Sequence, residues 1–305
     1  MTSAPTPVRT PGLDPAWLRR TVAVALDEDL GPAPGRDVTS QATIDPTTSG
    51  TAELVARADG VLAGLPVVAE VLDQVAVRLG TAPVRVEVLT ADGGRVVTGT
   101  RVARLVGPVL SLLVAERTML NLLSRASGVA THTRRWADAL EGTGARVLDT
   151  RKTTPGLREL EKYAVRCGGG TNKRMGLFDV AMVKDNHVVA AGSVTAAVRA
   201  VRKRFPDVEV QVEADTLAQA VEAVEAGARF LLLDNMAPEM LREVVAAVRA
   251  LEPTHGRVEL EATGNLTLEA AARVAATGVD HLSVGALTHS SPILDLALDL
   301  VGSPG

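Results

Sequence analysis

The chain has 305 residues, of which 46% are hydrophobic, and its formal net charge at pH 7 is −4. This length allows one large domain or two ordinary ones, and the hydrophobic content is ample for a core. A negative net charge with only 2% aromatic residues argues against a nucleic-acid-binding surface, which needs a basic face and stacking rings. Because no apolar run approaches the roughly 20 residues that span a bilayer, we also expect no membrane span.

The N-terminal stretch, residues 1–12, is rich in proline and predicts a disordered or loosely attached arm. It lacks the apolar core of a signal peptide, so we expect a cytoplasmic protein. Regular structure is predicted from Asp14, which can cap a helix that has Pro15 at its first position. The single cysteine, Cys167, excludes a disulfide within the chain and is predicted to be a small helix residue rather than a nucleophile.

Residues 13–128 combine short β-like runs with helical patterns, which predicts an N-terminal α+β domain with a mostly antiparallel sheet and helices on one face. A long apolar helical stretch follows from about Pro108 to Leu140, and it is predicted to be buried, or broken at Gly128 into two buried helices. Arg117 lies inside that stretch. Two roles remain open for it, a structural ion pair and an arginine delivered to a site.

After Gly144 strands and helices alternate, which predicts parallel βα units with right-handed crossovers. The predicted strands are 146–149, 180–183, 208–212, 230–233, 258–261 and 281–284. They recur about every 27 residues, so the chain is too short for the eight units of a closed barrel. An incomplete, open α/β barrel of six or seven strands over residues 129–288 fits best, and a doubly wound open sheet fits less well. A last helix, within residues 289–305, is predicted to join the N-terminal domain.

Positive charge is concentrated between Thr150 and Asn186. Arg151 and Lys152 follow one predicted strand and Lys184 follows the next, so these cations are expected at one shared rim of the barrel. Arg174 comes shortly after a run of three glycines. Cations in a confined site repel one another by about 1 to 4 kcal/mol per close pair unless an anion lies between them. The cluster therefore predicts a multiply charged anionic ligand.

Other polar residues of this stretch have ordinary explanations. Arg158, Lys162 and Arg166 are spaced by four and interleave with glutamates, so they are predicted to form surface pairs along one face of a helix. His187 has no second histidine at metal-ligand spacing and no paired serine or cysteine nearby. A structural role is therefore predicted for His187.

Carboxylates and small residues end the later strands. Glu213 and Asp234 each close an apolar strand, where a buried carboxylate needs a partner such as a cation, a metal ion or sugar hydroxyls. The pair suits Mg²⁺ or a ribose, and pairing with neighbouring lysines is the simpler alternative. The segments Thr263-Gly264-Asn265 and Ser283-Val284-Gly285-Ala286 place small residues before helices, where backbone N–H groups can receive phosphate.

Longer motifs are also present: TRKTTPGLRELEKYAVRCGGG, NKRMGL, VKDNH, LLDNM, VGALTHS, ERTMLNLLSRASGVAT and DLGPAPGRDVTS. Together they resemble the quinolinate phosphoribosyltransferase family over about residues 14–300. The resemblance implies that quinolinate and phosphoribosyl pyrophosphate, with Mg²⁺, give nicotinate mononucleotide, pyrophosphate and CO₂ in NAD biosynthesis. It also implies an N-terminal α/β sandwich domain, an open α/β barrel, and a homodimer whose sites use both subunits. A larger assembly of dimers is compatible with this.

The resemblance implies a role for each rim residue. The substrate-contacting residues would be Arg117, Thr150, Arg151, Lys152, Lys173, Arg174, Lys184, Glu213, Asp234, Thr263, Gly264, Asn265, Val284, Gly285 and Ala286. Arg151, Arg174 and Lys184 would hold the quinolinate carboxylates, joined by Arg117 of the other subunit. Lys152 would face the pyrophosphate, Glu213 and Asp234 the ribose hydroxyls and Mg²⁺, and the two small-residue segments the 5′-phosphate. Lys152, Lys184, Glu213 and Asp234 would be the catalytic set.

Lys173 departs from the family pattern, which has a histidine at this place in the motif. Lysine keeps a donor and a positive charge but cannot be a neutral acceptor. We expect Lys173 to contact a substrate carboxylate, and a solvent-facing side chain is the alternative. Two other functions stay open: a phosphoribosyltransferase of the same architecture for a different aromatic carboxylate, and a non-catalytic sensor of such anions. Glu213 and Asp234 favour catalysis, because an anion sensor gains nothing from carboxylates beside its ligand.

Overall fold

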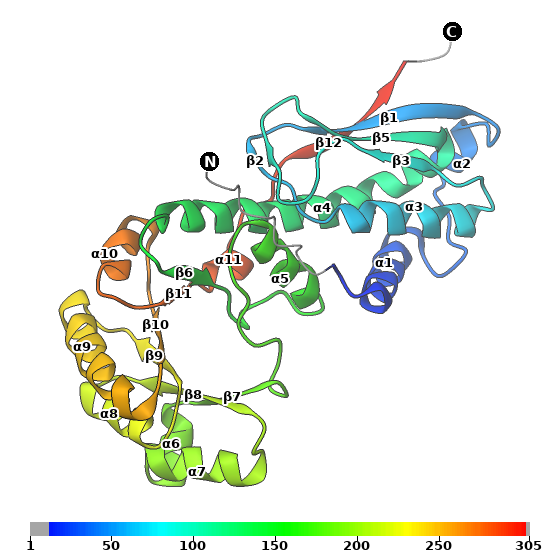
Figure 1. The fold of residues 1–305 in the computed structure, drawn as a ribbon. Coiled ribbons are helices and arrows are strands. Elements are labelled where there is room, and N and C mark those ends of the chain that lie inside the picture. Colours follow the sequence, from blue (N-terminus) through cyan, green and yellow to red (C-terminus); the bar gives the residue numbers. More distant parts are fainter. Residues whose placement is uncertain (1–11, 303–305) are drawn as a thin grey trace. The chain divides into compact units, whose positions relative to one another are not determined.

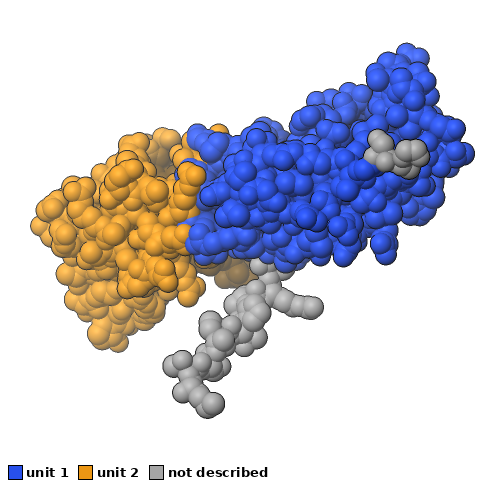
Figure 2. All heavy atoms as spheres, turned by 90° about the horizontal axis from the view of Figure 1, so that it is seen from above, with its two compact units in different colours: residues 1–134, 154–169, 290–305 blue, residues 135–153, 170–289 orange. Residues whose placement is uncertain are grey.

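The computed structural model describes residues 12–302. The chain divides into two compact units, and Figure 2 colours them blue (residues 1–134, 154–169 and 290–305) and orange (residues 135–153 and 170–289). The predicted arm, residues 1–12, lies outside the described residues except for Gly12, and the predicted domain boundary after residue 128 stays a prediction. Within residues 12–302, no helix is long and apolar enough to cross a membrane.

The first unit is built on an antiparallel sheet with the strand order β12-β1-β5-β3 (Figure 1). Its strands are β1 (Ser49–Ala56), β3 (Arg85–Val88), β5 (Arg101–Pro108) and β12 (Leu296–Val301), and a separate pair joins β2 (Gly60–Val61) to β4 (Arg95–Val96). Its helices are α1 (Pro15–Leu30), α2 (Ser40–Thr43), α3 (Leu65–Leu79), α5 (Arg158–Cys167) and most of α4 (Val109–Ala139). The α+β prediction is confirmed, as is the start of α1, where Asp14 Oδ1 accepts a hydrogen bond from the Trp17 N–H (2.7 Å) and Pro15 is the first helical residue.

The prediction of a helix within residues 289–305 is wrong. After the short helix α11 (Ala286–His289), the chain forms β12, which pairs with β1 over the register Ala56–Leu296 to Thr51–Val301. Leu296, Leu298 and Leu300 alternate with other residues, and this period of two is typical of a strand. Pairing with β12 also satisfies the backbone donors and acceptors on the edge of β1 that β5 leaves open.

Helix α4 is continuous over 31 residues, so Gly128 does not break it. Glycine has a packing reason at this position. A Cβ atom built on Gly128 would lie 2.0 Å from the carbonyl oxygen of Pro292, so any side chain would force the two segments apart. The glycine therefore allows close contact between α4 and the segment that leads into β12.

The face of α5 that carries Lys162 is not solvated, so that prediction is wrong. The side chains of Lys162 and Glu161 are both fully buried. Glu161 accepts hydrogen bonds from Arg125 Nη2 and from Thr154 Oγ1, each at 2.7 Å. A spacing of four identifies one face of a helix but does not reveal whether that face meets solvent or protein.

Cys167, at the end of the same helix, is unreactive. Burial raises the pKa of its thiol to about 12, and the nearby charge of Asp92 adds to this shift.

The second unit holds a parallel sheet of six strands with the order β6-β11-β10-β9-β8-β7. The strands are β6 (Arg146–Leu148), β7 (Val180–Val183), β8 (Glu209–Ala214), β9 (Phe230–Asp234), β10 (Glu259–Thr263) and β11 (His281–Ser283). The helices between them are α6 (Asp185–Ala191), α7 (Val194–Arg204), α8 (Leu217–Glu225), α9 (Pro238–His255) and α10 (Ala271–Ala275), the last preceded by the 3₁₀ turn η1 (Leu268–Ala270). The prediction of an open α/β barrel is confirmed.

The register of the parallel strands places the predicted rim residues in two successive layers at the carboxyl ends of the strands. Glu213 of β8 lies beside Leu232 of β9, and Asp234 of β9 lies beside Thr263 of β10. Carboxyl ends of parallel strands meet at the same end of an α/β barrel, where such folds carry their sites. The polar ends of the strands therefore surround a common space.

Candidate active site

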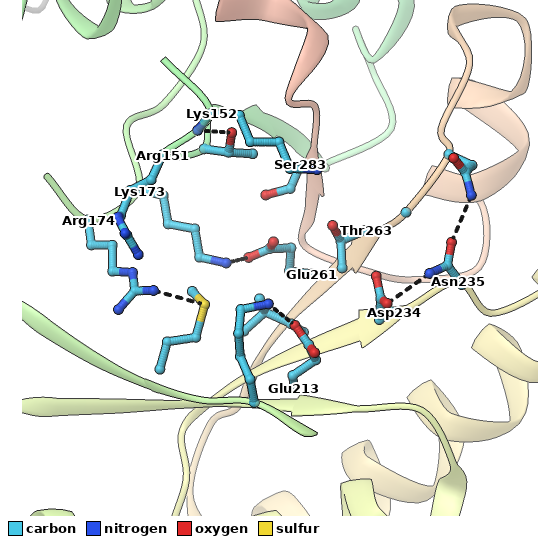
Figure 3. Close-up of a pocket in the computed structure, with 16 residues that line it drawn as sticks. Arg151, Lys152, Lys173, Arg174, Glu213, Asp234, Asn235, Glu261, Thr263 and Ser283 are labelled. Carbon is cyan, nitrogen blue, oxygen red and sulfur yellow. Dashed lines mark hydrogen bonds and ion pairs between the residues drawn. The ribbon is translucent and has the colours of Figure 1, made fainter. Parts of the chain in front are cut away.

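A cavity of about 560 Å³ opens at the carboxyl ends of the barrel strands (Figure 3). All its lining residues belong to the second unit: Thr150, Arg151, Lys152, Lys173, Arg174, Met182, Lys184, Glu213, Leu232, Asp234, Asn235, Glu261, Thr263, Gly264, Asn265 and Ser283. Figure 3 shows Arg151, Lys173 and Arg174 along one side of this cavity and Asp234 across from them. The cavity thus separates a cationic wall from a carboxylate.

Arg174 and Arg151 form the core of the cationic wall. The Arg174 guanidinium donates to the Val180 carbonyl oxygen (3.0 Å) and approaches the sulfur of Met182 (3.4 Å). Burial, followed by the nearby charge of Arg151, lowers the pKa of Arg174. Two neighbouring guanidinium groups on one side of a cavity repel each other and are stabilised by an anion bound between them, and planar carboxylates match their forked donors.

Lys173 has a carboxylate partner and lies beside an aromatic ring. Its ammonium forms an ion pair with the Glu261 carboxylate and lies 5.3 Å from the centre of the Phe230 ring. The Lys173 side chain is 7% exposed and that of Glu261 is 1% exposed, so the alternative of a solvent-facing Lys173 is wrong. Lys173 lines the cavity, as the substrate-contact prediction requires, but its charge is already compensated by Glu261.

The Lys173 pKa gives a testable dependence of stability on pH. Burial lowers this pKa below the usual 10.5, the charges of Arg174 and Lys184 lower it further, and Glu261 opposes the shift. Between the lowered pKa and 10.5 the unfolded chain binds more protons than the folded chain at this site, so the free energy of unfolding rises with pH in this window. We expect the wild type to gain stability relative to a Lys173→Met/Glu261→Gln protein as the pH rises towards the usual lysine pKa of 10.5, measured by urea unfolding. An unchanged difference between the two proteins would contradict the shift.

Lys184 makes a second lysine–glutamate pair, with Glu213, at a more open position. The Lys184 side chain is 44% exposed and that of Glu213 is 12% exposed. The Lys184 backbone N–H donates to His187 Nδ1 (3.0 Å), which orders the first turn of α6. His187 is not among the cavity residues, and this bond gives it the structural role that the sequence predicts.

The carboxylate side of the cavity is shaped by the turns after β9 and β10. Asp234 Oδ2 accepts a hydrogen bond from Asn235 Nδ2 (2.8 Å), and Asn235 Oδ1 accepts one from Asn265 Nδ2 (3.1 Å). A Cβ atom on Gly264 would lie 2.2 Å from Asn235 Oδ1, and the Gly264 φ of +90° is one that other residues rarely adopt. Glycine is therefore required where the two turns meet.

Glu213 and Asp234 carry carboxylate oxygens, the kind of ligand that Mg²⁺ prefers, and Glu213 is also paired with Lys184. Within residues 12–302, no three His, Cys, Asp or Glu side chains are grouped as metal ligands. Mg²⁺ does not require such a group, because it is commonly bound by one or two carboxylates together with substrate phosphates. Glu213 and Asp234 stand on adjacent strands and line one cavity, so both can contribute.

Comparisons with known proteins show the family of this chain. The model of the quinolinate phosphoribosyl transferase N-terminal domain matches residues 37–127, and that of the C-terminal domain matches residues 129–299. The chain belongs to the quinolinate phosphoribosyl transferase family. A nicotinate-nucleotide pyrophosphorylase [carboxylating] from Mycobacterium leprae is 48% identical over 283 residues, which cover 92% of this chain and 96% of that protein. A solved nicotinate-nucleotide pyrophosphorylase from Francisella tularensis is 34% identical with a TM-score of 0.86, covering 96% of this chain and 99% of that one.

Four residues that the family resemblance assigns to substrate do not line this cavity. Arg117 lies on α4 in the first unit, where its side chain is exposed. Val284 cannot give its backbone N–H to a phosphate, because that group donates to the Leu148 carbonyl oxygen (3.0 Å). Gly285 and Ala286 also lie outside the lining, although Gly285 leaves room for Lys152: a Cβ atom there would lie 3.0 Å from Lys152 Cδ. Their phosphate role stays a prediction.

Glu261 is the main cavity residue that sequence reasoning missed. A signal for it exists, because Glu259, Glu261 and Thr263 alternate along β10 and so point to the same face as the predicted phosphate-binding Thr263. The sequence does not say which cation such a glutamate meets. Leu232 of β9 was also missed, because it lies within an apolar run of the sequence. In the structure it pairs with Glu213 in the strand register and lines the cavity.

Proposed function

We propose that this protein transfers the phosphoribosyl group from phosphoribosyl pyrophosphate to quinolinate, with decarboxylation, to give nicotinate mononucleotide, pyrophosphate and CO₂. One observation carries the proposal: a single cavity places Arg151 and Arg174 on one side and Asp234 on the other. A dianionic pyridine dicarboxylate suits the first side. The hydroxyls of a ribose suit the second. The names of the Mycobacterium leprae and Francisella tularensis relatives support the same reaction.

The separation of charge across the cavity suits this reaction. Loss of pyrophosphate from the anomeric carbon builds positive charge on the ribose and negative charge on the leaving group. Glu213 and Asp234 would stabilise the ribose side, and Lys152 would stabilise the leaving group. Lys152 is available for this, because it forms no ion pair within the part of the chain that the structure describes. Glu213 and Asp234 would hold Mg²⁺, which would neutralise negative charge on the pyrophosphate of the substrate.

Decarboxylation then needs little further help from acid–base groups. The positive charge on the N-ribosylated ring nitrogen can stabilise the carbanion that the departing CO₂ leaves on the neighbouring ring carbon, and a proton from water then takes the place of CO₂ on that carbon. Arg151, Arg174 and Lys184 would hold the ring carboxylates in place and limit their solvation during this step. We therefore assign these three side chains to substrate orientation.

We also propose that the protein works as a homodimer in which Arg117 of one subunit completes the site of the other. The position of Arg117 supports this role, because its side chain is exposed on α4 next to the buried Ala115 and Thr118 and is therefore accessible to a second subunit. The cavity within one chain is lined only by residues of the second unit, whereas Arg117 belongs to the first.

The direct test is an assay of the purified protein with quinolinate, phosphoribosyl pyrophosphate and Mg²⁺. We expect nicotinate mononucleotide and CO₂ in equal amounts. Nicotinate, which lacks the second carboxylate, is expected to be a much poorer substrate because it cannot bridge Arg151 and Arg174. Tight binding of quinolinate without product would identify an anion sensor, and preferential use of another pyridine acid would assign a different substrate.

A further inference from the structure

The two halves of the cationic wall come from different segments that must be held at a fixed spacing. Arg151 and Lys152 follow β6, whereas Lys173 and Arg174 lie on the segment between Thr171 and Val180. β6 and β7 are the two ends of the strand order, so this segment leads from one edge of the open sheet to the other. No regular strand or helix fixes it at residues 172–174.

Asp149 joins the two segments. Its side chain is fully buried directly after β6, where Oδ1 accepts the backbone N–H of Lys173 (2.8 Å) and Oδ2 accepts the side-chain amide of Asn172 (2.6 Å). The Asp149 N–H donates to the Thr171 carbonyl oxygen (3.2 Å), and Thr171 forms a parallel bridge with Leu148. The Asp149 carboxylate thus extends the pairing of Leu148 with Thr171 to Asn172 and Lys173, directly before Arg174.

We propose that Asp149 is a positioning residue that sets the distance between Arg151 and the Lys173–Arg174 pair, and thereby the grip on the two substrate carboxylates. This inference rests on the proposed function. Lys152 has an anchor of its own, because its carbonyl oxygen accepts a hydrogen bond from Thr288 Oγ1 (2.8 Å). Loss of the Asp149 contacts therefore affects the quinolinate side of the cavity and leaves the pyrophosphate side in place.

Three variants separate this role from a general effect of charge or folding. Asp149→Ala removes both acceptors. Asp149→Asn keeps an oxygen for the Lys173 N–H, and its new amide can donate to Asn172 once the Asn172 amide turns over. Asn172→Ala removes the side-chain donor to Asp149 Oδ2 and leaves the buried carboxylate intact, so it serves if Asp149→Ala does not fold.

We expect Asp149→Ala to raise the KM for quinolinate about 30- to 100-fold, because a misplacement of about 1 Å can cost that much, and to change the KM for phosphoribosyl pyrophosphate less than about threefold. Asp149→Asn should stay within about fivefold of wild type, and Asn172→Ala should raise the quinolinate KM about three- to tenfold. Equal losses in Asp149→Asn and Asp149→Ala would overturn the proposal in favour of a charge effect. Parallel rises in both KM values, or an unchanged KM in Asn172→Ala, would overturn it as well.

Amide hydrogen exchange at Lys173 gives a second readout that needs no substrate. The Lys173 N–H should be protected in the wild type and in Asp149→Asn and should exchange faster in Asp149→Ala. If the wild type makes no nicotinate mononucleotide, the proposed function fails while this measurement still tests the anchor. If the wild type is active and Lys173 exchanges equally fast in all variants, the positioning role fails alone.

Discussion

An Arg117→Ala protein and a Lys152→Ala protein, each nearly inactive, are expected to regain activity when they are unfolded and refolded together. In the proposed dimer, the site that keeps Lys152 receives an intact Arg117 from the other subunit. Random mixing of equal amounts makes about half of the dimers mixed, and each mixed dimer has one intact site of two. We therefore expect about a quarter of wild-type activity, measured as nicotinate mononucleotide formed per mole of protein.

The control is a mixture of Lys152→Ala with Glu213→Gln. Both residues line the cavity of one chain, so no mixed dimer of these two variants contains an intact site, and no activity should return. If the Arg117 mixture stays inactive although mixed dimers are present, Arg117 acts within its own subunit.

Lys173→Ala is expected to lose both stability and quinolinate use. It removes the partner of Glu261, whose side chain is 1% exposed, and leaving one member of a buried ion pair uncompensated costs about 3 to 5 kcal/mol of unfolding free energy. Loss of a charge-assisted contact to a carboxylate should also lower kcat/KM for quinolinate about ten- to a hundredfold. Lys173→His should lose less activity, because it keeps a donor.

Lys184→Ala is the matched control for the stability effect. It breaks a lysine–glutamate pair of the same chemistry whose lysine is 44% exposed, so the expected cost is about 0 to 1 kcal/mol. The double variant Lys173→Met/Glu261→Gln should recover most of the lost stability, since neither of these two positions then buries an uncompensated charge. Equal destabilisation by Lys173→Ala and Lys184→Ala, measured by urea unfolding, would contradict the role assigned to burial.

The barrel was largely predictable because its elements are encoded locally. Each predicted strand from 146–149 to 281–284 overlaps an observed strand, since a short apolar run between turn residues is sufficient to specify it. The exception at the end of the chain is instructive. Residues 296–301 alternate as a strand does, yet they form one only because β1 offers an unpaired edge.

The candidate site was predictable to the extent that it consists of strand ends. Arg151, Lys184, Glu213 and Asp234 all line the cavity, because carboxyl ends of parallel strands converge wherever the fold is an α/β barrel. Burial was not predictable in the same way. Lys162 looked like a surface cation by its spacing, and it is fully buried.

The sequence by itself determined the order of the elements, the open barrel and the collection of cations and carboxylates at one rim, because periodicity and strand ends are properties of neighbouring residues. Only the tertiary structure decided which charges meet. Lys173 pairs with Glu261 across 88 residues of sequence, and Lys184 pairs with Glu213 across 29. Such pairs depend on strand register and on exclusion of water, and these arise only when distant segments pack together.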